Sequence, residues 1–126
     1  AEDGSVLAGV RAADGEPAPR TADLLAKLQR DIEPTPPSEG NTTLVCLMTD
    51  APLDKAECAR VARAGSAGLA RAIDPVFTDV DGDVVFCVAS GRERPAGRFP
   101  TLQAQALAAT VTAAAIRDAA RSARGS

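Results

Sequence analysis

From residue 42 onward, the apolar residues follow two spacings, one typical of strands and the other typical of helices. Residues 42–49 and 84–90 are short runs with apolar and β-branched side chains on both faces, which predicts strands covered on both sides. Residues 54–73 and 101–121 carry apolar side chains at helical spacing. The order strand, helix, strand, helix predicts an α/β fold. Because two strands make a poor independent sheet, we expect this segment to complete a larger one.

Local signals place the ends of several elements. Asp54 followed three residues later by Glu57 predicts a capping box at the start of the helix that ends near residue 73. Residues 21–32 predict a short amphipathic helix, and the three prolines of residues 33–41 predict a linker. The short apolar stretch within residues 1–16 is compatible with an edge strand or a loop.

Composition narrows the class of protein. The 126 residues are 45% apolar, enough for one domain with a core of small side chains, and the net charge is −3. The basic residues form no cluster with aromatic residues, which argues against nucleic acid as a partner. No signal peptide and no apolar run of membrane-spanning length is visible, so we expect no membrane association and a cytoplasmic location. The first residue is Ala1 and not Met, which predicts a piece of a longer protein.

Histidine is absent, which excludes a Ser-His-Asp or Cys-His arrangement and a histidine-based metal site within this chain. The three cysteines are far apart in the sequence and form no CxxC motif. We therefore expect reduced thiols, with Cys46 and Cys87 buried in strands and unreactive. Any nucleophilic chemistry has to come from another residue type.

The segment Asn41-Thr42-Thr43 is the strongest candidate for that chemistry, and it has three interpretations. It matches an N-glycosylation sequon, it is an ordinary start of a strand, or it is a site of self-cleavage. In the third case the Thr42 hydroxyl attacks the Asn41 carbonyl, and hydrolysis of the resulting ester leaves Thr42 as a new N-terminus. Its free amine, with an ordinary pKa of roughly 8, then serves as the base for its own hydroxyl and replaces histidine.

The second candidate is the acidic turn that contains Asp81 and Asp83, directly before the strand at 84–90. The spacing does not fit an EF-hand calcium loop, because glycine and glutamate are missing from the required positions. A solvated turn before a strand explains it equally well. If the strands at 42–49 and 84–90 are neighbours, both carboxylates lie near Thr42, where they can hold its ammonium group or orient its hydroxyl.

The segments NTTLVCLMTDAPL, GLARAI and DGDVVF together resemble the DmpA/NylC family of self-processing N-terminal-nucleophile amide hydrolases. This family includes DmpA-type aminopeptidases, nylon-oligomer hydrolase and a carbapenem-pathway pantetheine hydrolase. The resemblance covers only the C-terminal third of such a protein. It implies part of a four-layer αββα sandwich, cleavage between Asn41 and Thr42, Thr42 as nucleophile, and Asp81 and Asp83 beside it.

The resemblance also implies two regions and several partners. Residues 1–41 are expected to be the end of the pre-cleavage segment, and residues 42–126 the post-cleavage subunit that carries the nucleophile. The expected partners are the pre-cleavage subunit of the same precursor, a small amide or peptide substrate, and further copies in a homo-oligomer, with no cofactor. The family's upstream catalytic residues have no counterpart here, so the chain alone is expected to be inactive.

The expected function is therefore a self-cleaving N-terminal threonine amidohydrolase that acts on a small amide or peptide. Pantetheine-type amides, slightly favoured, short peptides with an N-terminal β- or D-residue, and 6-aminohexanoate oligomers are all open as substrates. The alternative from another class is a non-catalytic α/β structural or small-ligand-binding module, in which the two threonines only begin a strand. A regulatory fragment that docks onto a partner is a further alternative.

Overall fold

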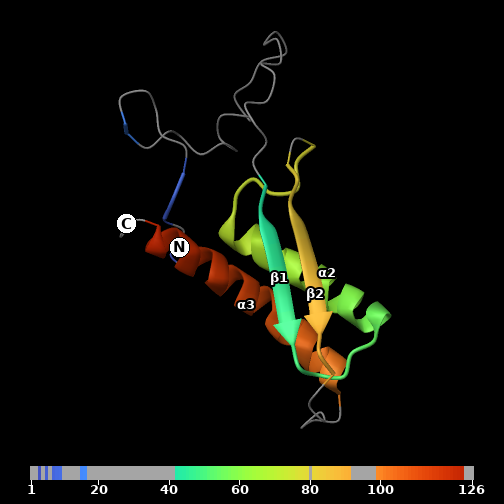
Figure 1. Cartoon of the computed structure of the whole chain (residues 1–126). Coiled ribbons are helices and arrows are strands. Elements are labelled where there is room, and N and C mark those ends of the chain that lie inside the picture. The colour runs from blue at the N-terminus through green and yellow to red at the C-terminus, as the bar shows by residue number, and fades with distance from the viewer. Residues whose placement is uncertain are drawn as a thin grey trace.

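The computed structural model describes residues 42–79, 81–91 and 99–123, together with residues 3, 5, 7–9 and 15–16. Its elements are β1 (Leu44–Thr49), α2 (Lys55–Ala72), β2 (Val84–Ala89) and α3 (Pro100–Ser122) (Figure 1). The α/β class and the order strand, helix, strand, helix are confirmed. The helix predicted at residues 21–32 and the linker at 33–41 lie outside the described residues.

The two strands are parallel neighbours, with Leu44 opposite Val84 and Thr49 opposite Ala89. The connection between them is α2, as parallel pairing requires a crossover and not a tight turn. The Val84 N–H donates to the Thr43 carbonyl at 3.0 Å, so the pairing extends to the residue before β1. The parallel direction therefore brings the start of both strands, and the residues that precede them, to the same end of the sheet.

Helix α2 begins with the capping box that the sequence predicts. The Asp54 carboxylate accepts from the Glu57 N–H at 2.7 Å, and the Glu57 carboxylate accepts from the Asp54 N–H at 2.9 Å. Glu57 also accepts from the Thr101 hydroxyl at 2.5 Å, which joins the first turn of α2 to the first turn of α3. Within the described ranges, no helix is both long enough and apolar enough to cross a membrane.

The core lies where α2 crosses α3 behind the sheet (Figure 1). Leu69 of α2 is fully buried, and Ala108 and Ala113 of α3 are almost so. Gly68 allows the close crossing, because a Cβ atom at this position would lie 2.4 Å from the Ala109 carbonyl oxygen and 2.6 Å from the Thr112 Cβ. Small residues on both helices thus replace the large side chains that the composition lacks.

Replacing Gly68 with alanine is expected to destabilise the chain, although alanine favours a helix. Overpacking costs about 1–3 kcal/mol, and here the added methyl meets backbone, which cannot rotate away. The gain in helix propensity offsets only about 1 kcal/mol. Urea denaturation should therefore give a lower midpoint for Gly68→Ala. Ala67→Ser, on the exposed side of the same turn, is the matched control. An unchanged or raised midpoint for Gly68→Ala would contradict the close crossing.

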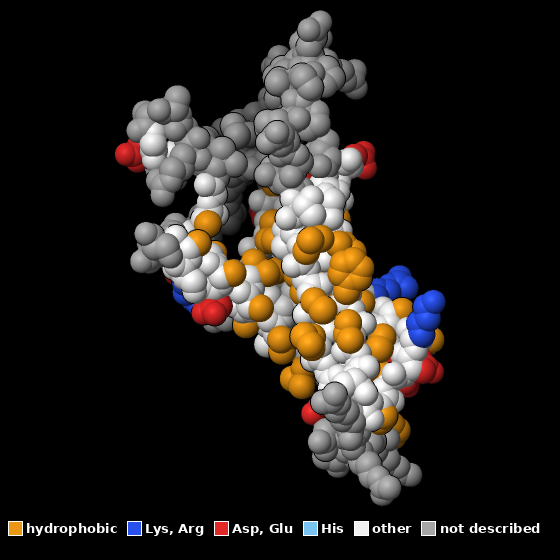
Figure 2. All heavy atoms as spheres, viewed as in Figure 1, with side chains coloured by type: hydrophobic (Ala, Val, Ile, Leu, Met, Phe, Trp, Pro, Cys, Tyr) orange, Lys and Arg blue, Asp and Glu red, His pale blue; other side chains and the backbone are white. Residues whose placement is uncertain are grey.

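The face of the sheet opposite the helices is open and apolar. Leu44 and Met48 of β1 are 70% and 82% exposed, and Phe86 and Val88 of β2 are 54% and 52% exposed. Figure 2 shows these hydrophobic side chains gathered over the two strands. The prediction that both strands are covered on both sides is therefore wrong for the described part of this chain, in which the helices cover one face only.

The expected burial of the Cys46 thiol is wrong for the same reason. Successive side chains of a strand point to opposite faces, and Cys46 shares the open face with Leu44 and Met48. Cys87 points to the helix side and is partly buried.

Candidate active site at the start of the sheet

Thr42 lies two residues before β1, exposed at the end of the sheet where both strands begin. The turn between Asp81 and Asp83 lies beside it. A Cβ atom placed on Gly82 would lie 2.6 Å from the Thr42 Oγ1 atom, so the threonine hydroxyl lies directly against the backbone at Gly82. The fold thus brings together the two segments that the sequence separates by about 40 residues.

Asp83 holds the residue that follows Thr42. Its Oδ1 atom accepts from the Thr43 N–H at 2.7 Å, and its Oδ2 atom accepts from the Phe77 N–H at 3.1 Å. The Thr43 carbonyl accepts from the Val84 N–H, so both backbone polar groups of Thr43 are bonded to the Asp83–Val84 segment. A carboxylate that accepts two backbone N–H groups is a strong and directional anchor.

Asp81 organises the loop that leads into this turn. Its Oδ2 atom accepts from both the N–H and the hydroxyl of Thr78, at 3.0 and 2.7 Å, and its own N–H donates to the Thr78 carbonyl at 3.0 Å. Phe77, the residue before Thr78, has a φ of 57°, an uncommon backbone conformation for a residue with a large side chain. The bond from Phe77 to Asp83 and the bonds from Thr78 to Asp81 hold the loop in this shape.

In the continuous chain, the hydrogen bonds of Asp81 and Asp83 therefore run to Thr43, Phe77 and Thr78. The ammonium group that both carboxylates were predicted to hold forms only when the bond before Thr42 breaks. Their predicted catalytic roles stay predictions. Asn41, the other residue of the predicted cleavage site, lies outside the described residues.

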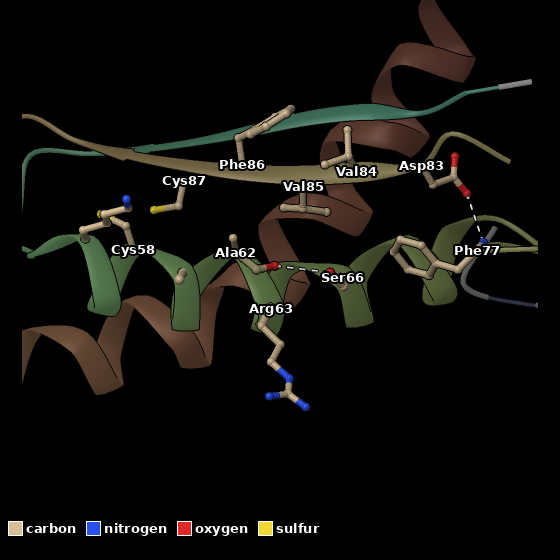
Figure 3. A pocket seen from close by; sticks show the side chains of 12 residues that line it. Cys58, Ala62, Arg63, Ser66, Phe77, Asp83, Val84, Val85, Phe86 and Cys87 are labelled. Atoms are coloured by element: carbon tan, nitrogen blue, oxygen red, sulfur yellow. Dashed lines mark hydrogen bonds between the residues drawn. The ribbon is translucent and has the colours of Figure 1, made fainter.

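A groove of about 570 Å³ begins at this end of the sheet and runs between β2 and α2 (Figure 3). Asp83 and Phe77 lie at one end of it, and Cys58 and Cys87 face each other at the other end. Four consecutive residues of β2, Val84 to Cys87, line the groove together with residues of α2. No three acidic, cysteine or histidine side chains converge as metal ligands in the part of the chain that the structure describes.

Cys87 is not a competing nucleophile. Burial and the neighbouring Cys58 thiol raise the pKa of Cys87 to about 11. At neutral pH its thiol is therefore protonated, and only a thiolate is a good nucleophile. This agrees with the expectation that the strand cysteine on the helix side is unreactive.

Three site residues were missed at the level of sequence. In the sequence, Gly82 is only part of an acidic turn, and Phe77 and Thr78 belong to a turn region with no predicted role. The signal for Gly82 was present, since glycine between two aspartates at the entry to a strand is typical of a close backbone approach. No local pattern indicates that Phe77 and Thr78 donate to these carboxylates.

The chain is similar to one protein family and to several curated proteins. A profile of peptidase family S58 matches residues 5–123. An uncharacterized aminopeptidase of Mycobacterium leprae is 51% identical over 57 residues, which is 45% of this chain and 16% of the relative. An uncharacterized aminopeptidase of Mycobacterium tuberculosis is 49% identical over 51 residues, which is 40% of this chain and 15% of the relative. The matched segments thus cover only a small part of the curated relatives. No solved structure matches the chain.

Proposed function

The chain belongs to peptidase family S58, and from this premise we propose that it is part of a longer precursor that cleaves itself before Thr42 and then hydrolyses small amides. Membership confirms the resemblance to the DmpA-type hydrolases and supports a peptidase or amide hydrolase. The observation that carries the finer proposal is the position of the Thr42 hydroxyl. It is exposed and lies against the turn of Asp81 and Asp83, in a chain that has no histidine.

The self-cleavage step uses the Thr42 hydroxyl as nucleophile. Its oxygen attacks the Asn41 carbonyl carbon, the Asn41–Thr42 C–N bond breaks, and the hydroxyl proton passes to the departing Thr42 nitrogen. Water then hydrolyses the Asn41 ester, which leaves a carboxylate on Asn41 and restores the hydroxyl of Thr42. The bonds to both sides of Thr43 support this step, because they fix the backbone next to the attacking group.

Turnover of a substrate uses the new amine. As the Thr42 oxygen attacks the substrate amide, the α-amine accepts the hydroxyl proton and delivers it to the leaving amine. Water then attacks the acyl carbon while the same amine accepts a proton from it. The bond between the acyl carbon and the Thr42 oxygen breaks, the amine returns the proton to that oxygen, and the acid product leaves. The proposal assigns Asp81 and Asp83 as the acidic partners of the Thr42 ammonium. Both side chains already lie in the turn against which the hydroxyl rests.

The names of the relatives support an aminopeptidase-type substrate, a short peptide with a free N-terminus. A pantetheine-type amide is the second class that we propose. The test is a panel on the complete, processed protein that contains peptides with N-terminal L-, D- and β-residues, their N-acetylated forms, pantetheine and a 6-aminohexanoate dimer. Hydrolysis of at least one amide is expected. Cleaved protein that hydrolyses none of them would overturn the proposed turnover.

We also propose that the open face of the sheet packs on a second sheet, as in an αββα sandwich. The alternation of apolar residues on that face supports this layering. The remaining assembly is proposed in the same way: residues 1–41 end the pre-cleavage segment, residues 42–126 form the subunit with the nucleophile, and the processed protein forms a homo-oligomer.

Thiol labelling tests the proposed layer. In the 126-residue chain Cys46 is exposed and is expected to react readily with N-ethylmaleimide at pH 7. In the complete precursor the same thiol should react at least about tenfold more slowly, because covered thiols are inert. Cys87, with its raised pKa, is the internal control that reacts slowly in both proteins. Equal labelling of Cys46 in both would show that no second layer covers this face.

A further inference from the structure

Gly82 differs from the other residues of the site because what matters there is the absence of a side chain. A Cβ atom on Gly82 would lie 2.6 Å from the Thr42 Oγ1 atom, 3.3 Å from Cγ2 and 3.5 Å from Cβ. Real Cβ atoms essentially never approach a heavy atom closer than 3.0 Å. Any side chain at position 82 must therefore displace the Thr42 hydroxyl first.

The need for glycine is spatial and not conformational. The φ angle of Gly82 lies outside the left-handed region, in contrast to those of Gly15 and Gly91, which are 84° and 65°. Alanine can adopt the backbone conformation of Gly82 without that strain. The methyl group of alanine would instead overlap the space that the Thr42 hydroxyl occupies.

The backbone next to Thr42 is held in place, so an added methyl group at position 82 acts on the Thr42 side chain. Thr43 is bonded through its N–H to Asp83 at 2.7 Å and through its carbonyl to Val84 at 3.0 Å. The turn that holds Thr43 in place is thus the one that brings Gly82 against Thr42. A threonine side chain is also stiff at χ1, because two heavy atoms are attached to its Cβ.

From this geometry we infer that Gly82 is a positioning residue for self-cleavage, since its bare backbone leaves the space in which the Thr42 hydroxyl is held for attack on the Asn41 carbonyl. This inference rests on the proposed function. A misplacement of about 1 Å at a reacting atom costs on the order of 100-fold in rate. A methyl group at position 82 would shift the hydroxyl by an amount of that order.

The test is the rate of self-cleavage of the complete precursor, followed by mass spectrometry. Gly82→Ala is expected to cleave about 100-fold more slowly than the wild type. Adding Thr42→Ser should recover at least about tenfold of this loss, because serine lacks the Cγ2 methyl and its freer χ1 lets the hydroxyl return to the Asn41 carbonyl. Asp79→Ala is the control. Its side chain is exposed in the same loop, and cleavage within about twofold of the wild type is expected.

A double-mutant cycle in melting temperature reports on the contact without any chemistry. Gly82→Ala should lower the melting temperature, and it should lower it less in a Thr42→Ala background, where only the ordinary 3.5 Å contact with Cβ is left. A loss of cleavage that serine does not rescue, with no coupling in this cycle, would show that Gly82 acts only through folding and would overturn the inference.

The remaining outcomes separate this inference from the proposed function. A wild-type precursor that cleaves before Thr42, together with a Gly82→Ala variant that cleaves within about twofold of it, would overturn the positioning role and leave the proposed function intact. A wild-type precursor that does not cleave would overturn both.

Discussion

Replacing Thr42 with alanine in the complete precursor is expected to stop self-cleavage and amide hydrolysis together. Alanine removes the hydroxyl that attacks in both reactions, and the chain offers no histidine that could activate another nucleophile. Removal of a nucleophile typically costs on the order of 10⁴-fold or more in rate. The fold should survive, because Thr42 is exposed and both backbone bonds of Thr43 are kept.

The measurements for this variant are the fraction of cut chain over time and the rate of hydrolysis of the substrate identified in the panel. Thr42→Ser is the matched variant, since it retains the hydroxyl and should retain part of both activities. Thr43→Ala is the neighbouring control, because it keeps the backbone bonds to Asp83 and Val84. Hydrolysis by the Thr42→Ala protein would show that another residue is the nucleophile.

Replacing Asp83 with alanine is expected to have the second largest effect, slowing self-cleavage by about 10³-fold. The carboxylate accepts N–H groups from Thr43 and Phe77, so its removal releases the backbone beside Thr42 and the loop at the same time. The Thr43 N–H is partly buried, and leaving it without a partner costs about 1–3 kcal/mol of stability. Unfolding in urea should therefore shift to a lower midpoint along with the loss of cleavage.

Asparagine at position 83 separates the contribution of this carboxylate to stability from its contribution to the cleavage rate. Its single amide oxygen can accept one of the two N–H groups, whereas its NH₂ group, a donor, cannot accept the other. Asp83→Asn should therefore recover part of the stability and little of the cleavage rate, while Asp79→Ala, in the same loop, should match the wild type in both. An Asp83→Ala precursor that cleaves at the wild-type rate would exclude any role of this side chain in positioning Thr42.

The elements of the fold follow from local patterns in the sequence. The capping box of Asp54 and Glu57 fixes the start of α2, and the two apolar runs become the paired strands. What no local pattern contains is the register of those strands. Because Leu44 lies opposite Val84, Thr42 meets Gly82, whereas a shift by one residue would place another part of the turn beside the hydroxyl.

The open face of the sheet shows what an apolar pattern cannot predict about burial. Apolar residues on both faces of a strand indicate that both faces are covered in the finished protein, but they do not indicate by which chain segment. Within the described residues, α2 and α3 cover one face, and Leu44, Cys46 and Met48 stay exposed on the other. The same pattern therefore predicted the strands correctly and the burial of Cys46 wrongly.

The contacts of the carboxylates are the least predictable part of the site. Asp81 and Asp83 were expected at the correct end of the sheet because they precede the second strand. Their partners are the backbone N–H groups of Thr43, Phe77 and Thr78 and the Thr78 hydroxyl. Such bonds depend on the conformation of the loop at 74–79, including the positive φ of Phe77. Residue types alone do not specify a loop of this kind.

Everything proposed for turnover depends on the amine that exists only after the chain is cut. The intact mass of the complete wild-type precursor, followed over time and combined with sequencing of any new N-terminus, tests this most directly. We expect two fragments, with the C-terminal one beginning at Thr42. A precursor that keeps its full mass while it hydrolyses amides, or a cut at any other bond, would contradict it.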